Sequence, residues 1–209
     1  EIMARHGDAA TLHLGGVPMI VADSIDFIRH DLVVFGSAVL LFLLVILASV
    51  FRKRRWILLP LLTCGATCLF MLGLLGMLGW RVTVVSSNFV SLLLILCLAL
   101  TLHIIVRFRE MHAQFPDADQ FTLVSQTIRR IVRPCFYTAL TTIVAFGSLL
   151  VSGIRPVIDF GWMMSIGIIV AFVYAFTLFP AALVLLQPGQ PRTRDDLTTS
   201  VTHFFARIN

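Results

Sequence analysis

The chain contains little charge. Of its 209 residues, 13% are charged and 58% are hydrophobic, whereas soluble proteins carry about 25% charged residues. This composition excludes an independent soluble enzyme, a nucleic-acid-binding module and a small secreted domain held by disulfides. We therefore predict a membrane protein.

Motifs for catalysis and nucleotide binding are missing. The sequence has no His-Glu-x-x-His motif, no Gly-x-Ser-x-Gly turn, no Walker phosphate loop and no Rossmann glycine signature. These motifs would supply a metal-bound water, a nucleophile or a phosphate cradle. We expect no enzyme activity, no cofactor and no nucleic-acid partner.

Cysteine and histidine are too few and too scattered to indicate a metal site. Cys64 and Cys68 lie four residues apart, a spacing too constrained on a helix for a normal disulfide, and they lack a second ligand pair for zinc. Cys97 and Cys135 are isolated in the sequence, and six histidines are spread along the chain. No metal or redox centre is predicted.

Five long runs contain no Asp, Glu, Lys or Arg. A bilayer core of about 30 Å requires about 20 residues of α-helix, and each run has a length of that order. We predict an all-α membrane protein with a transmembrane bundle over residues 32–186. The predicted spans are residues 32–51, 56–80, 88–106, 134–153 and 160–186.

The positions of Lys and Arg predict the orientation of the bundle. Twelve of the 16 basic residues lie on one side of the alternating spans, and cytoplasmic segments are enriched in such residues. Residues 1–31, the end of an extracytoplasmic domain and a leading helix, are therefore expected outside. Residues 187–209 are expected to form a cytoplasmic amphipathic tail. The four basic residues on the outer side are Arg5, Arg29, Arg81 and Arg155.

The segments that flank the spans have patterns of their own. Residues 14–21 are expected to be a short extended piece, followed by a helix that begins near Ser24 or Asp26. Residues 119–133 place apolar side chains on one stripe and arginines elsewhere. This pattern predicts a separate helix on the inner membrane surface, ending at Pro134.

Polar side chains inside the predicted spans are the candidate functional residues, because each needs a partner or a wet cavity. His103 lies one turn before Arg107, with Thr101 beside it. It is either a neutral imidazole bonded to a backbone carbonyl or a threonine, or a proton carrier that faces the bundle interior. An unperturbed pKa of about 6.5 suits the second role.

A threonine cluster in the fourth span and one tyrosine in the fifth complete the candidate set. The threonines could bond to their own helix or face His103 across a helix interface. The tyrosine is expected to pack in the core with its hydroxyl satisfied. These residues are Thr138, Thr141, Thr142 and Tyr174.

Several motifs occur together in the order found in one transporter superfamily. Residues 138–149 read Thr-x-x-Thr-Thr-x-x-x-Phe-x-Ser-Leu, residues 154–161 read Ile-x-Pro-x-x-x-Phe-Gly, and residues 178–181 read Leu-Phe-Pro-Ala. With HIIVRFRE at residues 103–110, the chain resembles a resistance-nodulation-division transporter of the MMPL-like and sterol-sensing branch. The resemblance covers roughly residues 14–187.

This resemblance implies spans two to six of a six-span half, excised from a larger protein of the bacterial inner membrane. The implied function is secondary export of lipids or other hydrophobic compounds, driven by the proton gradient through the whole protein. The implied partners are membrane lipids, a hydrophobic substrate, and a second half or further protomers. The alternatives are a sterol-sensing-like regulatory domain that binds lipid without transport, and an accessory subunit of protein translocation.

One departure from the family affects the mechanism. Such transporters usually carry an Asp about one turn before the position of His103, but residues 98–102 read Leu-Ala-Leu-Thr-Leu. No carboxylate occurs between Asp31 and Glu110. Either His103 substitutes for that Asp, the other half supplies a carboxylate, or this branch is not driven by protons.

Overall fold

The computed structural model describes residues 16–50, 55–80, 83, 86–116 and 118–185 of the chain. These residues contain helices and no strand. The elements are α2 (Val17–Val50), α3 (Arg55–Met77), α4 (Phe89–Gln114), α5 (Gln120–Gly147), the short 3-10 helix η1 (Ser148–Val151) and α6 (Arg155–Leu185).

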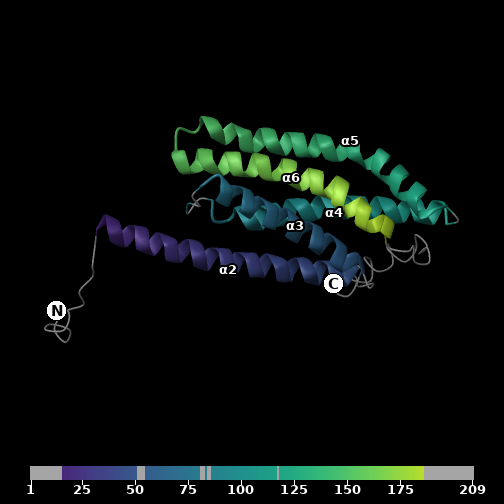
Figure 1. Cartoon of the computed structure of the whole chain (residues 1–209), viewed down its shortest axis with the longest axis horizontal. Helices are drawn as coiled ribbons and strands as arrows, with labels where there is room; N and C mark the ends of the chain where they lie inside the picture. Colours follow the sequence, from purple (N-terminus) through teal and green to yellow (C-terminus); the bar gives the residue numbers. More distant parts are fainter. Residues whose placement is uncertain (1–15, 51–54, 81–82, 84–85, 117, 186–209) are drawn as a thin grey trace, which may run out of the picture.

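The five α-helices run side by side, with α4 in the centre. Helix α6 lies between α5 and the pair α3 and α4, and α2 follows the opposite side of the bundle (Figure 1). Helix α4 contacts each of the other four α-helices. In the most apolar stretch of each helix, 56% of α4 is buried, against 12% of α2 and 11% of α5. Helices α2 and α5 are therefore peripheral.

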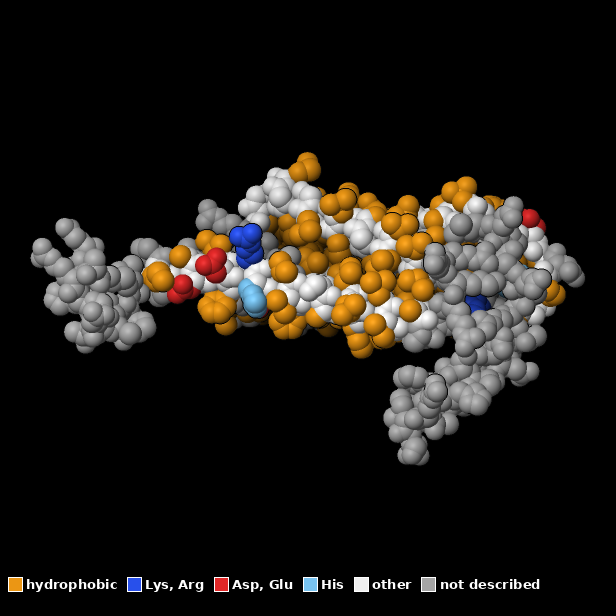
Figure 2. Space-filling model, turned by 90° about the horizontal axis from the view of Figure 1, so that it is seen from below, with side chains coloured by type: hydrophobic (Ala, Val, Ile, Leu, Met, Phe, Trp, Pro, Cys, Tyr) orange, Lys and Arg blue, Asp and Glu red, His pale blue; other side chains and the backbone are white. Residues whose placement is uncertain are grey.

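All five α-helices of the described ranges are long and apolar enough to cross a membrane, which confirms the prediction of an all-α, five-span bundle for this part of the chain. Hydrophobic side chains cover the middle of the face shown in Figure 2, and the charged side chains lie toward its ends. Helix α4 continues to Gln114, eight residues beyond the predicted end at residue 106. Hydropathy predicts where a helix leaves the lipid, whereas the helix itself can continue beyond that point.

Helix α2 begins earlier than predicted. Residues 17–21 are the first turn and a half of this helix, so the expected extended piece is wrong there, as is the start near Ser24 or Asp26. Proline is accepted in the first turn of a helix, because the N–H it lacks would have no partner there. Pro18 therefore does not prevent the helix from starting at Val17.

The separate surface helix over residues 119–133 is also not observed. Its residues form the first half of α5, which continues through Pro134 to Gly147, and the helix bends along its length (Figure 1). An internal proline removes one backbone hydrogen bond and bends a helix without always ending it. The predicted apolar stripe packs inward only in part, since Val124 is buried whereas Phe121 is 67% exposed. The predicted tail over residues 187–209 lies outside the described residues.

Local signals fix two helix ends. Gly79 adopts a left-handed conformation with a φ of 63°, and the N–H of Trp80 donates to the carbonyl of Leu75 at 3.0 Å. This six-to-one bond after a left-handed glycine closes the C-terminus of α3. At the start of α5, the carboxylate of Asp119 accepts from the N–H of Phe121 at 3.2 Å, as an N-cap does.

The core lies between α3, α4 and α6. Its most buried side chains are large and apolar, whether aliphatic, aromatic or sulfur-containing, and they are supplied by all three helices. Since lipid is as apolar as these side chains, their stabilising contribution comes mainly from close packing. They include Met71 of α3, Leu93, Ile104, Ile105 and Phe108 of α4, and Met163, Met164 and Phe179 of α6.

Candidate functional site

Two predicted site residues of α4 point in different directions. Thr101 is fully buried in the bundle, and its hydroxyl donates to the carbonyl of Leu98 at 2.9 Å. His103 is exposed. Residues two positions apart on a helix are separated by about 200° around its axis, so the structure does not bring these two side chains together.

His103 lines a cleft between α4 and α5 with a volume of about 530 Å³. The polar part of its lining is His103, Arg107 and Glu110 from α4 and Arg130 from α5. A guanidinium nitrogen of Arg107 lies 2.7 Å from a carboxylate oxygen of Glu110. The apolar part of the lining is Leu102, Val106, Ile131 and Pro134. His103 therefore lies at the outer side of the bundle among charged groups, not in its interior.

The three threonines of α5 donate to their own helix. Thr138 donates to the carbonyl of Pro134 at 3.0 Å, and both Thr141 and Thr142 donate to the carbonyl of Thr138, at 2.9 and 2.7 Å. These are the hydrogen bonds of the first alternative that the sequence left open. None of the three threonines lines the cleft that contains His103.

Tyr174 of α6 is half-buried and packs against α3. Its ring lies 5.6 Å from the ring of Phe70, measured between centroids. Phe70 is 47% exposed, so the contact lies at the edge of the bundle, and the expected hydrogen bond of the Tyr174 hydroxyl stays a prediction. The contact places the residue on the α3 side of the bundle, away from the cleft between α4 and α5.

A row of buried polar side chains between α3 and α4 was not predicted. It is called the polar line here and consists of Thr63, Cys64, Thr67 and Cys97. The hydroxyl of Thr67 donates to the carbonyl of Thr63 at 2.8 Å and lies 3.6 Å from the sulfur of Cys97. The thiol of Cys64 faces the same Cys97. The sequence suggested that Cys97 is isolated, but in the structure it lies beside two polar side chains of α3. Polar side chains repeat every four residues at positions 63 and 67 and at 64 and 68, and this spacing was the available signal.

These thiols do not assemble a metal site. Within the described ranges, no group of three or more His, Cys, Asp or Glu side chains has an arrangement that could hold a metal ion. All four cysteines are free and buried. In the same part of the chain, the buried polar residues are Ser, Thr and one His, and none of them is a carboxylate.

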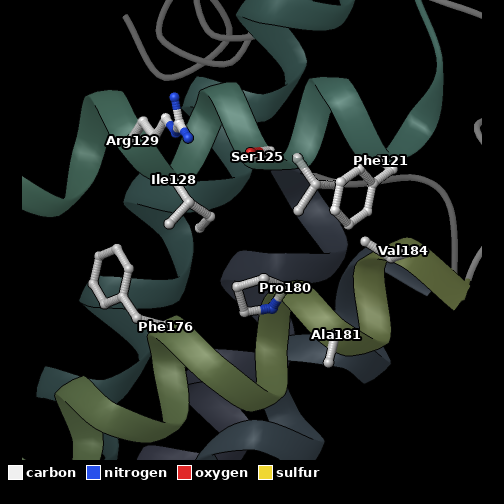
Figure 3. Close-up of a pocket in the computed structure, with 9 residues that line it drawn as sticks. Phe121, Ser125, Ile128, Arg129, Phe176, Pro180, Ala181 and Val184 are labelled. Atoms are coloured by element: carbon white, nitrogen blue, oxygen red, sulfur yellow. The ribbon is translucent and has the colours of Figure 1, made fainter.

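A second cleft, with a volume of about 330 Å³, separates α5 from the end of α6. Figure 3 shows Ile128 of α5 pointing toward α6, and Arg129 pointing away from it. The amide of Gln120 donates to the carbonyl of Leu183 at 2.8 Å and joins the two helices at one end. Apart from Ser125 and Arg129, the lining is apolar: Phe121, Val124, Ile128, Phe176, Pro180, Ala181 and Val184.

Comparison with known proteins identifies one family. The family model described as the MMPL family matches residues 2–206, which is nearly the whole chain. None of the curated proteins matches the chain. The family match points to a transporter-related or lipid-related membrane domain, and members of this family are transporters rather than enzymes.

Proposed function

Because this chain belongs to the MMPL family, we propose that it is the membrane part of a secondary exporter of lipids or other hydrophobic compounds. The intact protein would be driven by the proton gradient. The observation that carries the proposal is the family match over residues 2–206. The apolar cleft between α5 and α6 supports it, since a hydrophobic molecule can leave the bilayer through a gap between helices without losing an apolar environment.

The cleft between α4 and α5 supports His103 as the proton carrier. An imidazole can take up and release a proton, and a second positive charge beside Arg107 would weaken the attraction between Arg107 and Glu110. Protonation could then favour one of two arrangements of α4 and α5, and alternating between such arrangements is the basis of coupling in secondary transporters. The position that the family uses for an Asp remains without a carboxylate in this chain.

Export driven by protons can be tested in inverted vesicles that contain the full-length protein and a fluorescently labelled phospholipid. An imposed pH gradient should accelerate movement of the labelled lipid between leaflets, and a protonophore should remove the acceleration. Vesicles without the protein give the background rate. A protein-dependent rate that does not respond to the gradient would contradict proton coupling.

A second candidate function is a sterol-sensing-like domain that binds lipid and regulates without transport. The observation that favours it is the lack of any carboxylate among the buried polar residues of the described ranges, because a relay carboxylate in the bundle interior is the usual proton site. A photoactivatable lipid analogue would then label the full-length protein, while the labelled phospholipid would not move between leaflets under any gradient.

We also propose that the Arg-rich end of the bundle faces the cytoplasm of a bacterial cell. In this orientation, Gln114 at the end of α4 lies inside, and Ser152 before α6 lies outside. In intact cells, a membrane-impermeant maleimide should label Ser152→Cys but not Gln114→Cys until the membrane is permeabilised. The four native thiols are buried and give little background. The opposite labelling would reverse the orientation.

A further inference from the structure

The cleft between α4 and α5 combines positive charge with an apolar wall. Arg107 and Arg130 approach it from two different helices, and Glu110 contributes the opposing charge. The remaining wall is made by Leu102, Val106, Ile131 and Pro134. A groove that is basic at one end and apolar along its side matches a ligand with an anionic head and a hydrocarbon chain.

The charges in the cleft do not cancel. Glu110 is bound by Arg107 at 2.7 Å. The ion pairs found within the described ranges are Arg107 with Glu110 and Arg155 with Asp159, and Arg130 belongs to neither. The guanidinium of Arg107 has five N–H donors, so one contact to Glu110 leaves donors for a further oxygen. The cleft therefore presents a net positive charge with several unused hydrogen-bond donors.

The position of the cleft favours a lipid over a soluble anion. It lies at the Arg-rich end of two membrane-spanning helices, and Val106 beside it is 47% exposed on the outer face of the bundle. An acyl chain can lie along that surface while its phosphate stays at the headgroup level. Basic pockets between transmembrane helices on the cytoplasmic side are known to hold anionic headgroups.

We propose that this cleft is a binding site for an anionic phospholipid of the Arg-rich leaflet. The phosphate lies between Arg130 and the remaining donors of Arg107, and one acyl chain follows Val106 and Ile131. Bound in this way, the lipid joins α4 to α5 at a cleft that shares no lining residue with the cleft between α5 and α6. The lipid shares this cleft with His103, but its binding does not require transport, so a protein that failed to export would still bind the lipid here.

The test is lipid binding to the purified full-length protein, followed by native mass spectrometry. Phosphatidylglycerol should bind more tightly than phosphatidylcholine, which has the same phosphate but no net charge. Arg130→Ala should weaken phosphatidylglycerol binding about tenfold, because it removes a charge-assisted hydrogen bond. The matched control is Arg133→Ala, which removes one exposed positive charge from the same helix without altering the lining of either cleft.

A second variant moves the affinity in the opposite direction. Glu110→Gln removes the opposing carboxylate while keeping nearly the same shape, so it should raise the affinity for phosphatidylglycerol by a few-fold. A variant that merely disturbed the fold would not tighten binding. The thermal unfolding temperature of each variant without added lipid shows that the protein remains folded.

Three results would overturn the proposal. Equal losses in Arg130→Ala and Arg133→Ala would show general attraction to a basic surface. Equal binding of the two phospholipids would remove the charge argument. Displacement of phosphatidylglycerol by millimolar inorganic phosphate would assign the cleft to a soluble anion. Selective binding that is lost in Arg130→Ala and increased in Glu110→Gln would support the lipid site.

Discussion

Helix α4 carries polar side chains on two of its faces, and the two faces differ in kind. Toward the bundle interior, the polar groups are Thr101 and Cys97, which are buried and uncharged. Thr101 bonds to its own helix, and Cys97 lies close to Thr67 of α3. Toward α5, they are His103, Arg107 and Glu110, which border an open cleft. Charge inside a bilayer is expensive unless it is paired or hydrated, whereas a hydroxyl can bond to its own helix.

The two faces of α4 therefore differ in role: the buried polar groups contribute to the structure, and the accessible ones are available for function. The buried groups on the first face bond to a backbone carbonyl or lie against another buried polar side chain. Groups between α4 and α5 can gain or lose a proton or bind an anion, because they are accessible. Substitutions on the first face should therefore affect stability, and substitutions on the second should affect function while leaving stability nearly unchanged.

The largest effect is expected from truncating a core side chain. Phe179 is fully buried among α3, α4 and α6, and Phe179→Ala should lower the free energy of unfolding by about 3–5 kcal/mol. Phe42 of α2 is 63% exposed and provides the matched control, with little expected change. Denaturant unfolding in detergent micelles measures both. A similar loss in the two variants would contradict the assignment of the core.

The next effect concerns the close approach of α6 to the end of α5. A Cβ at Gly161 would lie 2.8 Å from the carbonyl oxygen of Phe146, whereas one at Gly73 would meet nothing within 4 Å. Gly161→Ala should therefore destabilise the protein by about 1–3 kcal/mol, as overpacking does. Gly73→Ala should not destabilise it. The same unfolding experiment distinguishes them, and equal tolerance of both substitutions would mean that α5 and α6 are farther apart.

Removing a hydroxyl between α3 and α4 should cost less. Thr67→Val keeps the shape of the side chain but removes its contacts with Thr63 and Cys97. Only the contact with Cys97 joins two helices, and hydrogen bonds between membrane helices contribute about 0.6 kcal/mol on average. We expect a loss of that order in unfolding free energy. A loss of several kcal/mol would show that this interface depends on its polar line and not on packing.

The smallest effect on stability is expected in the cleft. Glu110 and Arg107 are about half and one-third exposed, so their ion pair is screened. Glu110→Gln should change the free energy of unfolding by about 0.3–0.5 kcal/mol. Unfolding at low and high salt checks this value, since a screened pair loses most of its contribution at high salt. A larger loss would make the cleft part of the structural framework.

The sequence predicts the membrane spans well and the elements at their ends poorly. The length of an apolar run reflects the thickness of the bilayer, so the five predicted spans correspond to the five long helices. Local propensity does not decide whether a helix accepts a proline at a given position. The start of α2 at Val17 and the continuation of α5 through Pro134 both depend on this. In both cases the prediction excluded a proline from a helix, whereas the backbone at that proline is helical.

The candidate site was only partly predictable, because its geometry depends on how helices rotate against one another. Position alone could not tell whether His103 faces the interior or the outside of the bundle. Pairing of Thr67 with Cys97 likewise joins residues 30 positions apart in sequence. The repeat of polar residues every four positions in α3 was visible, but the partner on α4 was not.

The most direct test of this separation between the two faces of α4 compares His103→Ala with Thr101→Val in the full-length protein. Both are assayed in inverted vesicles for gradient-driven movement of a fluorescently labelled phospholipid, after their expression levels have been matched. We predict that His103→Ala reduces the rate to the level measured with a protonophore, whereas Thr101→Val retains gradient-driven movement. A full rate in His103→Ala, or its loss in Thr101→Val alone, would contradict the assignment of proton chemistry to the cleft.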